Sequence, residues 1–64
     1  MKYAEMEKVD AGLRFKSPAG LVVETTGTSK HIPAHNMYVH EVAVVEGVGQ
    51  GEKHFLNLDY AQAI

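Results

Sequence analysis

The alternation of apolar and polar side chains predicts a first β-hairpin near the start of the chain. Residues 13–16 alternate between inward and outward positions, with Leu13 and Phe15 on the apolar side, which is the period-two pattern of a half-buried strand. Residues 21–26 are rich in β-branched side chains and predict the returning strand. The intervening Ser-Pro-Ala-Gly supplies the proline and glycine of a tight turn.

The length of the turn fixes how these two strands pair. A three-residue loop at positions 18–20, with its glycine in the left-handed conformation, places Phe15 opposite Val23 and Arg14 opposite Glu24. The apolar pair then shares the core side, and the opposite charges share the water side. A two-residue turn would set Arg14 against Val23 and mix the faces, so we expect the longer loop.

A second hairpin is predicted in the other half of the chain. Residues 25–36, TTGTSKHIPAHN, indicate a long polar loop, and residues 37–46, MYVHEVAVVE, form the most strand-like segment. The glycine-rich GVGQGEK at 47–53 turns the chain, and HFLNLDY at 54–60 returns as a strand.

The strand at 37–46 is apolar on both parities, which is unusual for a strand with one face in water. Met37 and Val39 belong to one parity, while Tyr38 and Val42 belong to the other. Either a bulge exchanges its faces midway, or a second element covers the outer face. That cover is expected to be the N-terminal segment or a second copy of the chain.

The two ends of the chain give weaker patterns. Residues 1–9 fit a short helix or an edge strand, and we interpret them as a frayed strand. The final YAQAI, residues 60–64, suits a closing helical turn.

With VDAGLRFKSPAGLVVETTG in view, the chain resembles a Src-homology-3-like small barrel in its architecture. The resemblance extends over roughly the whole chain and implies five short strands around one small core, with the partner site on the loops. The chain has no tryptophan, so the proline-peptide binding of that family is not implied. We therefore expect one all-β domain, 1–64, built from two hairpins as a four- to five-stranded curled sheet or Src-homology-3-like barrel.

Composition narrows the functional classes. A chain of 64 residues is long enough for one small core, and the absence of cysteine removes thiolate nucleophiles and cysteine zinc sites. The net charge is −2 and the basic residues are scattered, so nucleic acid is not the expected partner. No apolar segment approaches the length of a membrane span, and a cytoplasmic location is expected.

Three of the four histidines lie in KHIPAHNMYVH, which raises the question of a metal site. His31 and His35 have the interval of a helical pair, but the proline between them opposes a helix. His40 would complete a set of three, with His54 or Glu41 as a fourth ligand. This spacing matches no recurrent zinc pattern, so a histidine-based metal-binding protein is the alternative hypothesis rather than the first.

Catalytic and phosphate-binding patterns are not evident. GVGQG precedes a predicted strand rather than a helix, so it is interpreted as a flexible hairpin loop. Ser17 and Ser29 fit turn chemistry, and no two carboxylates are marked as a catalytic pair. We predict no catalytic residue, no resident metal and no cofactor.

The sequence thus predicts a non-catalytic binding or assembly module. Its expected partner is another protein or a second copy of the chain in a homodimer, since symmetric pairing would bury the outer apolar face of the strand at 37–46. We expect the partner to contact the long loop and the start of this strand. The candidate binding residues are His31, His35, Tyr38 and His40.

Overall fold

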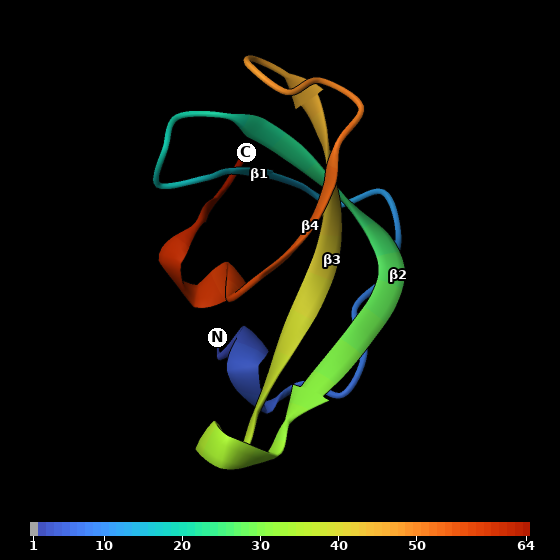
Figure 1. The fold of residues 1–64 in the computed structure, drawn as a ribbon, viewed down its shortest axis with the longest axis vertical. Coiled ribbons are helices and arrows are strands. Elements are labelled where there is room, and N and C mark those ends of the chain that lie inside the picture. The colour runs from blue at the N-terminus through green and yellow to red at the C-terminus, as the bar shows by residue number, and fades with distance from the viewer. Residues whose placement is uncertain (1) are drawn as a thin grey trace.

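The computed structural model describes residues 2–64 and shows one antiparallel sheet of five strands in the order β4-β3-β2-β1-β5 (Figure 1). The all-β prediction is confirmed. The sheet is neither closed nor strongly curled, and the Src-homology-3-like barrel stays a prediction. The strands are β1 (Arg14–Lys16), β2 (Val22–Ile32), β3 (Met37–Glu46), β4 (Lys53–Leu56) and β5 (Gln62–Ala63).

The first hairpin has the predicted register. Phe15 pairs with Val23 and Arg14 pairs with Glu24, and the Arg14 Nε lies 3.1 Å from a Glu24 carboxylate oxygen. Gly20 has a φ of 86°, a left-handed conformation that costs glycine little and other residues more. Turn chemistry and cross-strand pairing therefore agree at this hairpin.

One residue of the first strand differs from the prediction. Leu13 was expected to point into the core, yet it is 40 % exposed. β1 begins only at Arg14, and Leu13 lies just beyond this short paired segment. Phe15, which is 2 % exposed, is the β1 side chain at the centre of the core.

The predicted polar loop at 25–36 is wrong over most of its length, because β2 continues through residue 32. Only a 3₁₀ turn, η2 (Pro33–His35), and Asn36 connect β2 to β3. The ladder between these strands shifts register between Thr25 and Ser29. Gly27, with a φ of 90°, lies in this bulge. Polar side chains are tolerated in this half of β2 because much of it faces water.

β3 keeps the same face inward from His40 to Val44. His40, Val42 and Val44 are buried on the inner face, and the positions between them are half-buried. The register shift opposite the bulge of β2 leaves this parity unchanged, so the expected exchange of faces midway along the strand is wrong. At the end of β3 a second shift leaves Val45 without a partner, and Glu46 beyond it is exposed. The N-terminal turn also packs on the inner face, through Tyr3 and His40.

Both chain ends differ from their predictions. The first described residues form a 3₁₀ turn, η1 (Tyr3–Glu5), instead of a frayed strand, and residue 1 lies outside the described residues. Near the other end, β4 stops at Leu56 and a second turn, η3 (Leu58–Tyr60), replaces the end of the predicted strand at 54–60. β5 then occupies the place of the predicted closing helical turn.

The core lies between the inner face of the sheet and the two terminal turns. Tyr3 packs edge-on against Phe15, with ring centroids 5.4 Å apart, and Leu58 of η3 is 1 % exposed. The buried apolar side chains are Val9, Phe15, Val23, Val42, Val44 and Leu58. This small core depends on residues from both ends of the chain.

Candidate functional site

The long β2–β3 hairpin brings two of the predicted binding residues together. His31 and Tyr38 are cross-strand partners, and their rings lie 4.8 Å apart at an angle of 40°. Of the two residues, His31 is exposed and Tyr38 is half-buried. The pair is thus an aromatic surface carried by two paired strands.

The structure places His40 inside the molecule. It is 0 % exposed, and its ring forms two hydrogen bonds, one between Nδ1 and Ser29 Oγ at 2.7 Å and one between Nε2 and the Tyr3 carbonyl at 2.8 Å. A carbonyl only accepts, so Nε2 donates to Tyr3, while the serine hydroxyl bonded to Nδ1 is able to donate or to accept. His40 therefore supports the hairpin from within and leaves no ring nitrogen free for a partner.

The serine–histidine contact is the arrangement from which nucleophilic catalysis starts. In hydrolytic triads a carboxylate orients the histidine and stabilises the imidazolium that forms. Here that place is taken by the neutral carbonyl of Tyr3. The geometry therefore fits a satisfied polar contact in the core better than a nucleophile.

The remaining histidines do not join this group. His35 is exposed in η2, and His54 on β4 lies 3.3 Å from a carboxylate oxygen of Glu52. Within residues 2–64, no three histidine, aspartate or glutamate side chains come close enough to hold a metal ion. Since both ring nitrogens of His40 are also engaged, the geometry gives no support to the metal-binding alternative.

A hollow of about 460 Å³ lies beside the His31–Tyr38 pair. One wall comes from the segment between η1 and β1, and the other comes from the bulge of β2 and from β3. The lining residues are Glu7, Lys8, Gly27, Ser29 and Tyr38. We define these five residues as the hairpin hollow.

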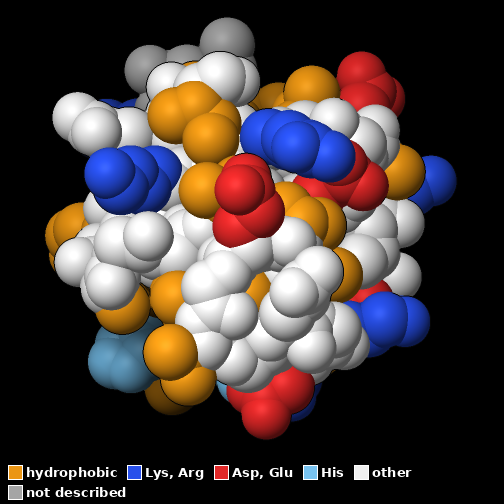
Figure 2. All heavy atoms as spheres, turned by 90° about the horizontal axis from the view of Figure 1, so that it is seen from above, with side chains coloured by type: hydrophobic (Ala, Val, Ile, Leu, Met, Phe, Trp, Pro, Cys, Tyr) orange, Lys and Arg blue, Asp and Glu red, His pale blue; other side chains and the backbone are white. Residues whose placement is uncertain are grey.

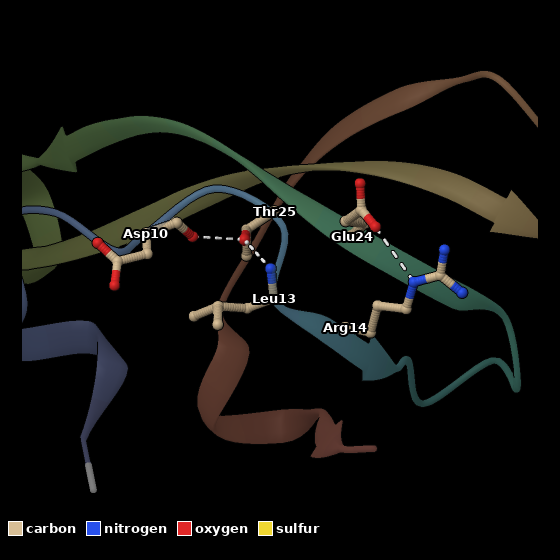
Figure 3. A network of polar contacts seen from close by, with 5 residues as sticks. All are labelled: Asp10, Leu13, Arg14, Glu24 and Thr25. Atoms are coloured by element: carbon tan, nitrogen blue, oxygen red, sulfur yellow. Dashed lines mark hydrogen bonds and ion pairs between the residues drawn. The ribbon is translucent and has the colours of Figure 1, made fainter.

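Thr25 holds the N-terminal wall of the hairpin hollow in place (Figure 3). Its hydroxyl donates to the Asp10 carbonyl at 2.6 Å and accepts from the Leu13 N–H at 2.9 Å. The Thr25 carbonyl also accepts from the Gly12 N–H at 2.9 Å. Thr25 is buried and its polar groups are bonded, so it anchors residues 10–13 to β2. This anchor lies just before the bulge of β2.

The sequence predicted only Tyr38 among the residues of the hairpin hollow. Glu7 and Lys8 were assigned to a frayed strand, and Ser29 to a loop. Gly27 was the available signal, because an isolated glycine between β-branched and polar strand residues suggests a bulge. Glu7 and Lys8 come close to that bulge through contacts between segments that are distant in sequence, so local sequence patterns do not predict their position.

In residues 2–64, no helix has the length and apolar character that a membrane crossing requires. The cytoplasmic location stays a prediction. Comparisons with family models, with curated proteins and with solved structures give no significant match.

Proposed function

We propose that this protein is a non-catalytic binding module whose partner, another protein, docks at the hairpin hollow. The hollow itself carries the proposal, because its volume of about 460 Å³ leaves room for side chains of a partner beside the Tyr38 ring. Tyr38 supports it as well, because tyrosine is enriched among the residues that contribute most to protein interfaces. A five-stranded sheet with one small core also supports the Src-homology-3-like resemblance, as an open variant.

The charge distribution supports a protein partner rather than nucleic acid. One acidic and one basic side chain, Glu7 and Lys8, line the same hollow. On the face seen in Figure 2, basic, acidic and hydrophobic side chains are mixed, and the basic ones form no continuous stripe. Phosphate backbones are bound by clusters of lysine and arginine.

The proposal is tested with two tyrosine variants and peptides selected on the intact protein from a random phage-displayed library. Tyr38→Ala is expected to weaken binding of a selected peptide by about tenfold or more, since truncating an aromatic anchor costs about 2 kcal/mol. Tyr60→Ala is the matched control, because Tyr60 is 76 % exposed on η3. Fluorescence polarisation measures both affinities.

Two results would contradict this function. One is a failure to select any peptide. The other is a peptide whose affinity falls with Tyr60→Ala and stays unchanged with Tyr38→Ala, since its site would then lie away from the hairpin hollow.

Self-association is a second candidate, favoured by the outer face of the sheet. Met37 and Val39 are half-buried there, and Phe55, which follows the same parity through its pairing with Glu41, is 43 % exposed. A homodimer covering this face would have twice the protomer mass of 7.0 kDa. Sedimentation equilibrium at micromolar concentration checks this, and a mass equal to one protomer would exclude the dimer under those conditions.

A further inference from the structure

The half of β2 that follows the bulge has a paired strand on one side only. β3 pairs with residues 29–32, whereas β1 pairs with β2 only at Val22–Glu24. The last backbone bonds on the β1 side reach Thr25, from Gly12 and to Leu13. Within the described chain, no backbone hydrogen bond joins residues 6–11 to β2 beyond that point. This part of β2 is therefore an open sheet edge.

Strand alternation identifies which backbone groups face the open side. Val44 exchanges two 2.9 Å backbone bonds with the loop before β4, so even-numbered residues of β3 face β4. Odd-numbered residues, including Val39, then face β2. Lys30 is the partner of Val39 and directs its backbone groups to β3. The N–H and C=O groups of Ser29 and His31 consequently point to the open side.

The hairpin hollow lies against the same edge. Gly27 and Ser29 of β2 line it together with Glu7 and Lys8 of the N-terminal segment. The N-terminal segment runs along this side of β2 after η1 (Figure 1), without pairing to it. An added strand would lie about 4.8 Å from β2, where the edge supplies backbone bonds and the hollow supplies room for side chains.

We propose that the partner segment binds as an additional β-strand paired with the Ser29–His31 edge. This inference rests on the proposed function and names the chemistry of its ligand: an extended peptide segment that contributes its backbone N–H and C=O groups. Main-chain bonds supply much of the affinity in this mode of recognition, and side-chain pockets supply specificity. Proline is excluded at the paired positions because it has no N–H.

His31→Pro tests the edge directly, with the library-selected peptide as the probe. The variant removes an N–H that faces the open side, so the bonds between β2 and β3 are kept. We expect the affinity for the selected peptide to fall by about tenfold or more. The peptide loses the hydrogen bond from the N–H of residue 31, and the proline ring collides with its backbone. Ala63→Pro is the matched control, because the Ile64 N–H bonds Arg14 and alternation turns the Ala63 N–H away from β1. Its affinity is expected to be unchanged.

A second measurement uses the parent protein alone. N-methylation at successive backbone positions of the selected peptide is expected to weaken binding at every second residue, since only alternate residues face β2. On binding, the Ser29 and His31 amides should exchange more slowly with solvent, as measured by NMR.

These outcomes separate the two proposals. Peptide binding that is sensitive to Tyr38→Ala, without a two-residue period in the N-methyl scan or protection of the edge amides, would overturn strand addition and leave the binding module standing. Failure to select any peptide would overturn both. If His31→Pro lowers the melting temperature strongly, the N-methyl scan and amide exchange on the parent protein decide the question.

Discussion

At the residue scale, His40 connects three parts of the molecule. Its ring joins Ser29 on β2 to the backbone of Tyr3 in η1, while its own backbone lies in β3. A buried polar group costs free energy unless its bonds are satisfied, and here both ring nitrogens have partners. The same contacts hold Ser29, one of the residues of the hairpin hollow, in place.

Replacing His40 is therefore expected to destabilise the fold. His40→Leu leaves the Ser29 hydroxyl and the Tyr3 carbonyl without their partner, at a cost of about 1–3 kcal/mol in the free energy of unfolding. His35→Leu is the matched control, since His35 is exposed, and it should change stability by no more than about 0.5 kcal/mol. Urea denaturation measures both values. Equal stability of His40→Leu and the parent would show that this contact does not stabilise the fold.

At the element scale, the two hairpins differ in how much of their structure is encoded locally. The first is set by a proline, a glycine and an adjacent pair of opposite charges, so register follows from neighbouring residues. The structure of the long hairpin depends on pairing between its strands. The second half of its β2 strand, residues 27–32, contains glycine, serine and lysine, which are typical of a loop, and it becomes a strand because β3 supplies the pairing.

The bulge of β2 shows the same dependence on tertiary structure. Gly27 permits the left-handed backbone there, but the hairpin hollow also needs the N-terminal segment on the opposite wall. That segment is positioned by Thr25, which is 15 residues from Asp10 along the chain. Local patterns alone therefore predicted Tyr38 and missed most of the residues around it.

At the scale of the whole molecule, the two ends of the chain hold each other. Asp59 in η3 accepts hydrogen bonds from the N–H groups of Tyr3 and Ala4, at 2.7 Å and 3.1 Å. The bond from the Tyr3 N–H is the main cause that lowers the pKa of Asp59 below its ordinary value of 3.8. The contact joins η1 to η3, and both turns contribute to the core.

The hydrogen bonds between the Asp59 carboxylate and η1 predict a specific response to acid. Because the folded-state pKa of Asp59 is lowered, the ionised carboxylate stabilises the fold fully above the ordinary value, and this contribution is lost as the pH falls through the lower folded value. Asp59→Asn should therefore lower the melting temperature most near neutral pH. The difference from the parent should shrink in acid below the ordinary pKa.

The matched control for the acid response is Asp10→Asn, because Asp10 bonds Thr25 through its backbone carbonyl, which this substitution keeps. Thermal unfolding followed by circular dichroism, from neutral pH to acid, measures the melting temperatures of the parent and the two variants. A deficit of Asp59→Asn that stays constant with pH, or that grows in acid, would contradict the assigned role of the carboxylate.

The sequence by itself determined the all-β class, the turn at 18–20 and the pairing of Phe15 with Val23, because period-two patterning and turn chemistry act over a few residues. Only the tertiary structure decided that residues 27–32 form a strand, that His40 is buried and that Glu7 and Ser29 line the same hollow. Those features depend on contacts between segments distant in sequence, where pairing and burial override the local preference of polar residues for loops.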